Sequence, residues 1–446
     1  MKLFNLFLFH FLFLSSWVLA QEQPLLKSGP MVGYSGMREV ALWAQTSRPA
    51  SVHIEYWVKG LETTKFKTNV VQTSKSNAFV AQLLADEVLP DKVYEYTLFL
   101  DNKAIKMSYP LEFQAQQLWK WRTNVPPPTF SFALGSCLYV NETPYDRGGK
   151  PYGGDYEIFT AIQQKKPDFM LWLGDNTYLR EADWDTRTGI LHRHTHTRSL
   201  PELQPLLGRT HHYAIWDDHD YGPNDSDKSY AQKHLTLEAF KLFWANPNYG
   251  VANNGQGISG SFDWADVQFF MLDNRSFRTS YKAKNTYKEV YGKEQIDWLI
   301  NSLTASTATF KIIVSGTQVL NDAPIYENYA VYEERADFLK RLRESGVRGI
   351  MFLSGDRHHT VLSKMKESPE LYPFYDFTVS PLTSGTYPMG EDEKNTWFVP
   401  NSMFAKKNFA IVTVSGERKE RVLTLAVYDQ KGAELWSQKI SEKELR

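Results

Sequence analysis

The stretch that decides the fold is residues 213–220, YAIWDDHD, in which a short apolar run ends in four titratable side chains. An apolar run of this length between polar segments is typical of a buried strand. The carboxyl ends of such strands meet at one edge of a layered α/β sheet, where these folds bind ligands. Three further apolar runs end similarly: residues 130–134 before Gly135-Ser136-Cys137, residues 169–173 before Gly174-Asp175-Asn176-Thr177-Tyr178, and residues 350–353 before Ser354-Gly355-Asp356-Arg357-His358-His359.

Working outward from these runs, the pattern predicts a two-sheet layered α/β domain over residues 129–446. Further strands are expected at 267–272, 310–314, 409–414 and 422–427, and helices at 235–244, 294–303 and 337–343. Short alternating runs over residues 33–113 predict an all-β sandwich of the fibronectin or immunoglobulin type, assigned to residues 21–118. The proline triplet at 126–128 marks the boundary between the two domains.

Residues 1–20 predict a cleavable Sec-type export signal, because Lys2 precedes an apolar run that ends in Val18-Leu19-Ala20. The run is too short for a stable membrane span, so we expect a periplasmic or extracellular protein. The 50 basic and 51 acidic residues give a net charge of −1, which disfavours nucleic-acid binding by bulk charge. The single cysteine, Cys137, excludes an intrachain disulfide.

The four strand ends offer carboxylates, imidazoles, one thiol and one phenol. Several carboxylates in one pocket repel one another unless cations are present, so their convergence predicts a multinuclear metal site. Carboxylates suit hard cations such as calcium, whereas a thiolate or phenolate beside them favours iron or another transition metal. His192, His194 and His196 alternate in a polar stretch, interpreted as solvated or substrate-facing with an accessory metal as the alternative, and His211 and His212 are interpreted as a turn.

With these motifs in hand, the chain resembles the PhoD-like alkaline phosphatase and phosphodiesterase family, a branch of the metallophosphatases related to purple acid phosphatases. The resemblance implies one Fe³⁺ and two Ca²⁺ ions and a small phosphate-ester substrate, either a monoester or a diester. It places the iron among Cys137, Asp175, Tyr178 and His358. It makes Asp175 a bridge to calcium, with Asp218 and Asp356 completing the calcium sites.

The resemblance also implies attack on phosphorus by a hydroxide held between iron and calcium. His219, beside the ligand Asp218, is the candidate general acid for the leaving oxygen. Arg198 is the favoured residue for holding the phosphate oxygens, because its spacing before Asp218 resembles that of the family's arginine, with Asn224 and His359 as helpers. Arg357 either helps or braces the sheet edge.

Two readings from other classes of protein stand beside this one. The first is a thiol-dependent hydrolase with Cys137 as nucleophile and His219 or His358 as base, which the lone cysteine permits. Such an enzyme needs no acidic cluster, and carboxylates raise the pKa of a thiol. The second is a non-catalytic surface module that binds through the β-sandwich. The clusters at all four strand ends argue against that module.

Overall fold

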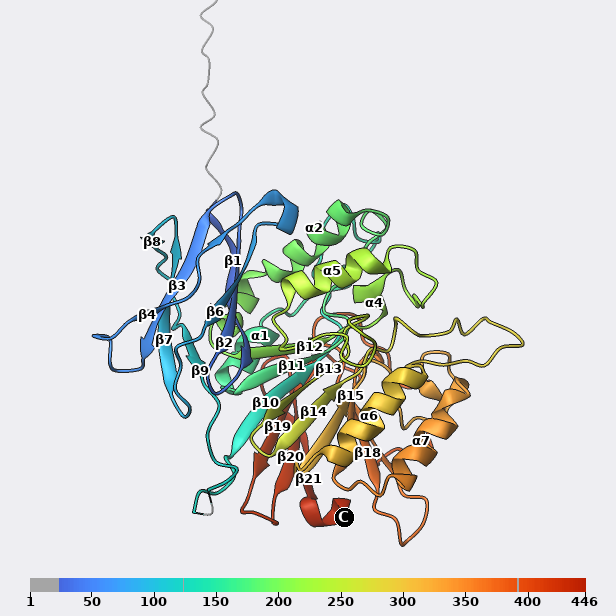
Figure 1. Ribbon diagram of the computed structural model, residues 1–446. Helices are drawn as coiled ribbons and strands as arrows, with labels where there is room; N and C mark the ends of the chain where they lie inside the picture. The colour runs from blue at the N-terminus through green and yellow to red at the C-terminus, as the bar shows by residue number, and fades with distance from the viewer. Residues whose placement is uncertain (1–23, 123, 391–392) are drawn as a thin grey trace, which may run out of the picture.

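The computed structural model describes residues 24–122, 124–390 and 393–446, so the export signal predicted for residues 1–20 lies outside the described residues. Three sheets and seven α-helices make up this part of the chain (Figure 1). The helices are α1 (Ile158–Gln164), α2 (Arg187–Arg198), α3 (Gln204–Leu207), α4 (Asp218–Tyr221), α5 (Lys233–Phe243), α6 (Lys293–Ala305) and α7 (Glu334–Glu344), with 3-10 turns at η1 (Lys75–Asn77), η2 (Pro201–Leu203), η3 (Tyr329–Val331) and η4 (Glu442–Leu445).

The largest sheet has nine strands in the order β21-β20-β19-β10-β11-β12-β1-β2-β6. Its central strands β10, β11 and β12 run parallel, and every residue of β11 and β12 is buried, as the apolar sequence of β11 predicted. The strands are β1 (Leu26–Ser35), β2 (Val40–Thr46), β6 (Val80–Ala85), β10 (Phe130–Gly135), β11 (Phe169–Leu173), β12 (His211–Ile215), β19 (Asn408–Ser415), β20 (Val422–Asp429) and β21 (Glu434–Ser441).

A second sheet of six strands, in the order β13-β14-β15-β16-β18-β17, packs on the first. Phe132 and Phe169 of the first sheet stack at 4.8 Å between ring centroids, and Phe269 meets Phe132 edge-on at 5.3 Å. Helices α6 and α7 lie side by side on the other face of the second sheet (Figure 1). The strands are β13 (Gly260–Trp264), β14 (Val267–Met271), β15 (Phe310–Val314), β16 (Ile350–Ser354), β17 (Val361–Met365) and β18 (Phe374–Thr378).

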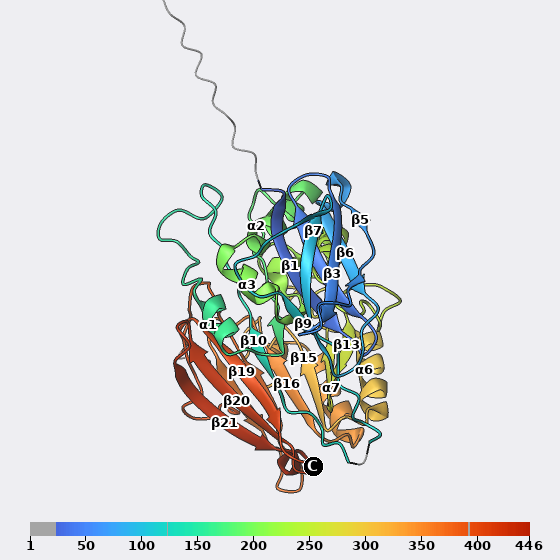
Figure 2. The ribbon, with the colours of Figure 1, turned by 90° about the vertical axis from the view of Figure 1, so that its left-hand side faces the viewer.

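The predicted N-terminal β-sandwich is present, and one of its sheets continues the nine-stranded sheet. Strands β1, β2 and β6 extend the nine-stranded sheet, and Val32 of β1 pairs in parallel with His211 of β12. The facing sheet packs on them through Ile54 and Leu98. Figure 2 shows the strands of the two sheets next to each other. It contains β3 (Ser51–Val58), β4 (Phe66–Lys67), β5 (Val71–Gln72), β7 (Val93–Leu100), β8 (Lys103–Ala104) and β9 (Glu112–Gln114).

The turn predicted at His211 and His212 is wrong, because both residues begin β12 and are buried. His211 Nδ1 donates to the Gly33 carbonyl at 2.7 Å, and His212 Nδ1 accepts from the Trp172 indole at 3.0 Å. Burial lowers the pKa of His211 to about 4 and that of His212 to about 3, so both are neutral at pH 7. None of the described helices is long and apolar enough to cross a membrane.

Candidate metal centre

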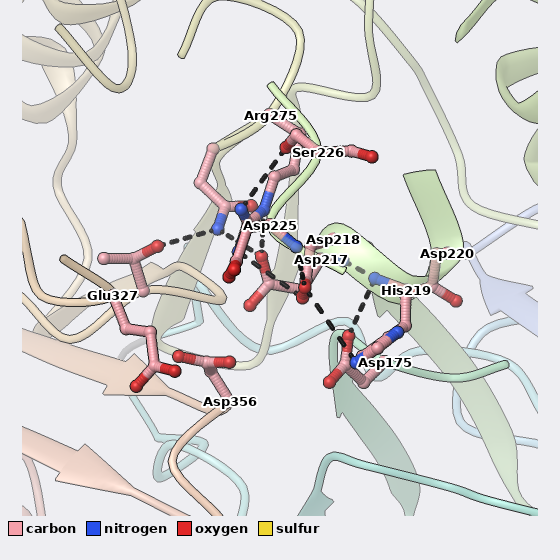
Figure 3. Close-up of polar contacts among 12 residues, drawn as sticks. Asp175, Asp217, Asp218, His219, Asp220, Asp225, Ser226, Arg275, Glu327 and Asp356 are labelled. Carbon is pink, nitrogen blue, oxygen red and sulfur yellow. Dashed lines mark hydrogen bonds and ion pairs between the residues drawn. The ribbon is translucent and has the colours of Figure 1, made fainter. Parts of the chain in front are cut away.

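The four strand ends meet as the sequence predicted, at the carboxyl ends of β10, β11 and β12 of the first sheet and β16 of the second. Tyr178 donates its phenolic hydrogen to Asp175 Oδ2 at 3.0 Å, and its oxygen lies 3.3 Å from Nε2 of His358. The Cys137 thiol lies 3.5 Å from the same Asp175 oxygen. Figure 3 shows Asp218 and Asp356 across the same space from Asp175.

Possible ligand atoms fall into three overlapping groups, within each of which they all lie within 4.8 Å of one another. Asp175 belongs to the first two groups, and Asp218 belongs to the second and third. Shared carboxylates of this kind are how adjacent metal ions are bridged, so the geometry fits a row of up to three ions. The groups are Cys137, Asp175 and His358, then Asp175, Asp218 and His219, then Asp217, Asp218 and Asp356.

The backbone at these ligands is strained. Cys137, Asp175, Asp356 and His358 all have left-handed φ values, between 51° and 68°. Non-glycine residues adopt this conformation rarely, and such residues cluster at functional sites where the surrounding structure holds them. The chain therefore turns sharply at the ligands themselves.

The glycines before the ligands act mainly through close packing. A Cβ atom on Gly174 would lie 2.7 Å from Cβ of Asp217, and one on Gly355 would lie 2.6 Å from the Leu173 carbonyl oxygen. Gly174 also has a φ of +95°. These positions let the ends of neighbouring strands approach closely enough for the ligand groups to overlap.

The electrostatics of the empty protein oppose the charged forms of the ligands. Burial, with Asp218, Cys137 and other acids nearby, raises the pKa of Asp175 well above its usual value. Burial and the charges of Glu327 and Asp217 do the same for Asp356. Burial raises the pKa of the Cys137 thiol to about 12. Cations would remove this penalty, because they favour the deprotonated form of each ligand.

Asp218 is the exception, because cations already face it. Burial opposes its ionisation, but His219 and the Arg275 guanidinium lower its pKa below the usual value. Arg275 forms a close ion pair with Asp217 through Nε, and its Nη2 lies 3.5 Å from Asp218 Oδ1 (Figure 3). Asp217, Asp218 and Arg275 are all buried. Asp217 stands in the acidic run of residues 217–220 but was not predicted as a ligand, and Arg275 was not predicted as a site residue.

Two buried carboxylate oxygens indicate that these residues fit metal ions. Asp217 Oδ2 and Asp218 Oδ1 are buried, and among the described residues neither accepts a hydrogen bond, although Arg275 Nη2 lies 3.5 Å from Asp218 Oδ1. A buried carboxylate oxygen without a donor is costly, and a cation satisfies it. The donor set of the third group contains only carboxylates, as a hard cation prefers, whereas the first group adds a thiol, an imidazole and the nearby phenol of Tyr178. The residues therefore fit a mixed metal centre.

Asp220 supports the centre from outside. Its Oδ2 accepts from the backbone N–H groups of Asp217 at 3.0 Å and Asn176 at 3.1 Å, and its Oδ1 accepts from that of Thr177 at 3.1 Å. The carboxylate thus joins the loop after β11 to the loop after β12. Burial raises its pKa to about 8.

The centre forms one end of a cavity of about 1150 Å³. Of the predicted catalytic residues, His219, Asn224 and His359 line it, as does Arg357. The His219 ring tilts against that of Tyr178 at 4.0 Å between centroids, and its backbone N–H donates to Asp175 at 3.3 Å. His359 donates from Nδ1 to the Tyr387 carbonyl at 3.0 Å.

Arg357 is held by two carboxylates, which fits the interpretation that it braces the sheet edge. It forms ion pairs with Glu327 and, at 2.8 Å, with Glu393.

The structure does not bring Arg198 to this cavity. Its guanidinium lies 3.8 Å from the ring centre of Trp244 and donates to the sulfur of Met31 at 3.0 Å, because Arg198 ends helix α2 on its buried side. Phosphate binding by Arg198 is therefore corrected to a role in packing the core.

The histidines of α2 do not form one tract either. His194 is buried, whereas His192 is exposed and meets Glu142 at 2.9 Å. His196 lies 3.8 Å from the same glutamate. The helical turn sends His194 to the opposite side of α2 from the other two.

A layered α/β fold with overlapping ligand groups at its strand ends has the arrangement of a candidate metal-binding centre. The model of the PhoD-like phosphatase family matches residues 132–420, and the chain belongs to this family. A domain of unknown function (DUF7800) matches residues 23–118. The chain is similar to alkaline phosphatase D of Bacillus subtilis (strain 168), at 23% identity over 360 residues, which is 68% of this chain and 58% of that protein.

The fold is also similar to a solved structure of PhoD. That match has a TM-score of 0.73 and 17% identity, and it covers 93% of this chain and 92% of that one. The chain spans less than two thirds of the curated relative it matches, whereas the structural likeness extends over nearly the whole chain. The predicted fold class and the family resemblance are both confirmed.

Proposed function

We propose that this protein is an exported, metal-dependent phosphatase that hydrolyses phosphomonoesters and phosphodiesters. The overlap of three ligand groups through Asp175 and Asp218, open to a large cavity, carries the proposal. Membership of the PhoD-like phosphatase family supports the reaction class. Export rests on the signal predicted in residues 1–20.

The donor atoms of the ligand residues favour different metals at the two ends of the centre. Cys137, Tyr178 and His358 with Asp175 would hold a ferric ion, and Asp175, Asp217, Asp218 and Asp356 would hold two calcium ions. When bound, such ions activate water for attack on phosphorus and offset the charge that builds on the phosphoryl oxygens.

The side chains of the protein orient this chemistry. Asp220 fixes the loops that carry Asp175 and Asp218, and Arg275 keeps Asp217 and Asp218 ionised. His219 lies in the cavity wall beside both carboxylates, where it can donate a proton to the leaving oxygen.

The location of Cys137 disfavours the thiol-dependent alternative. Its side chain is fully buried, it is not among the residues that line the cavity, and burial raises the pKa of its thiol to about 12. The nucleophile of a thiol enzyme is a thiolate that its substrate can reach. A metal ligand can be buried away from the substrate, and the metal itself favours its thiolate form.

The test is elemental analysis of natively exported protein together with hydrolysis of p-nitrophenyl phosphate and bis-p-nitrophenyl phosphate. Two matched variants separate the two kinds of metal site. Cys137→Ser should lose iron and keep calcium, whereas Asp356→Asn should lose calcium and keep iron, and each should lower turnover. Asp263→Asn, an exposed change on β13, is the control and should change neither metal content nor turnover. Full activity after exhaustive chelation would overturn the proposal.

A further inference from the structure

Four cationic side chains line the cavity, and they differ in their partners. Arg180 forms an ion pair with Asp146 at 2.9 Å, and Arg357 forms ion pairs with Glu327 and Glu393. Arg147 and Lys150, in contrast, are exposed and form no ion pair with any carboxylate of the described residues. The free positive charge of the cavity is therefore concentrated at residues 147–150, outside the acidic metal centre.

Strong contacts hold both ends of the segment that carries these two cations. On one side, Asp146 accepts from Arg180 Nε at 3.0 Å and from the Tyr139 hydroxyl at 2.9 Å. On the other side, the ring of Tyr152 packs edge-on against Tyr139 at 4.9 Å, and its hydroxyl lies 3.3 Å from His358 Nδ1.

Only five residues separate these two fixed points, Asp146 and Tyr152. Arg147 and Lys150 are therefore presented at the cavity wall by a segment tied to the metal centre itself, through Tyr152 and His358.

We propose that Arg147 and Lys150 form a second anion subsite, which selects phosphate esters whose leaving group carries a further phosphate. The proposal rests on the proposed function, since the phosphoryl group to be cleaved occupies the metal end. The remainder of the substrate then extends along the cavity past the half-exposed ring of Tyr145. A phosphate there accepts charge-assisted hydrogen bonds from a guanidinium and an ammonium that have no competing protein partner.

The experiment compares propane-1,3-diol monophosphate with propane-1,3-diol bisphosphate, which differ only in the second phosphate. The wild-type protein and the Arg147→Gln/Lys150→Gln variant are assayed for turnover and, by calorimetry, for binding of each compound. The control is Lys103→Gln/Lys106→Gln, which removes the same charge from the N-terminal sheet, away from the cavity. Glu181→Gln removes an exposed negative charge from the cavity wall and tests whether charge near the subsite controls the binding of the second phosphate.

In the wild type and in the control, the bisphosphate should be preferred in both kcat/KM and affinity. In the Arg147→Gln/Lys150→Gln variant, the ratio of bisphosphate to monophosphate should fall about tenfold. Raised salt should shrink the preference of the wild type, and Glu181→Gln should increase it.

An unchanged ratio in the Arg147→Gln/Lys150→Gln variant would overturn the subsite. A wild type that binds the bisphosphate through these two residues but hydrolyses neither compound would leave the subsite standing and refute the phosphatase reaction.

Discussion

Loading the centre with metal should release protons, and the structure indicates how many. At pH 7.5 the Cys137 thiol, with a pKa of about 12, and the Tyr178 phenol, whose pKa burial raises well above its usual value, are both protonated. Ligation of a metal ion as thiolate and phenolate removes both protons. Ionising Cys137 alone at this pH costs about 6 kcal/mol, which the metal bonds must supply.

These two protons alone make the apparent affinity rise about a hundredfold for each unit of pH near neutrality, and any proton that Asp175 releases adds to this. The assay is calorimetric titration of metal-free protein with ferric citrate in two buffers that differ in ionisation enthalpy. Cys137→Ser, which should not retain iron, should release neither ligand proton, and its titration is the blank for protons released by the iron complex itself. Identical release from both proteins would refute the assignment of Cys137 as a ligand.

Three further predictions concern catalysis and stability. His219→Asn should lower turnover about 10² to 10⁴-fold on alkyl phosphates and far less on nitrophenyl esters, and equal losses on both would remove His219 from the acid role. His212 has its pKa lowered to about 3, so the unfolded chain binds its proton more readily below pH 6.5. The free energy of unfolding should therefore decrease as the pH is lowered, by about 2 kcal/mol at pH 5 for this residue. His212→Asn should flatten the curve of unfolding free energy against pH by that amount. Asp266→Ala should cost 3 to 5 kcal/mol in urea unfolding, roughly, because it strands the buried Arg421 guanidinium that Asp266 holds at 2.8 and 2.9 Å, and a loss below 1 kcal/mol would contradict this.

The sequence predicts the strands and their convergence because both follow from local patterns. Apolar runs of five residues form β11 and β15 with the expected bounds, and the residue types after each run identify the metal centre. The pairing of Val32 with His211 joins segments 179 positions apart, and alternation along either strand carries no signal for it. The polar start of β12 concealed two strand residues, because the imidazoles of His211 and His212 are satisfied by partners distant in the sequence.

The direction in which a side chain points was the second property that the sequence did not predict. Spacing in the sequence suggested Arg198 for the phosphate, but the rotation of α2 turns that residue into the core against Trp244. Asp217 precedes the predicted ligand Asp218, and only the structure reveals that one of its oxygens is free while the other binds Arg275. The left-handed φ of the ligands is likewise not predictable from residue type, because most residues of the same types elsewhere in the chain have negative φ.

The parallel contact between β1 and β12 bears on any attempt to shorten this protein. Residues 24–118 cannot be removed without damage to the rest of the fold. Loss of β1 would turn β12, whose last residues begin the YAIWDDHD run, into an unpaired edge strand of the sheet. A truncated chain would expose unsatisfied peptide groups a few residues from the candidate metal centre and would favour self-association there. Residues 24–118 therefore belong to the framework that positions the metal centre, and an engineered version should keep β1 and β12 together.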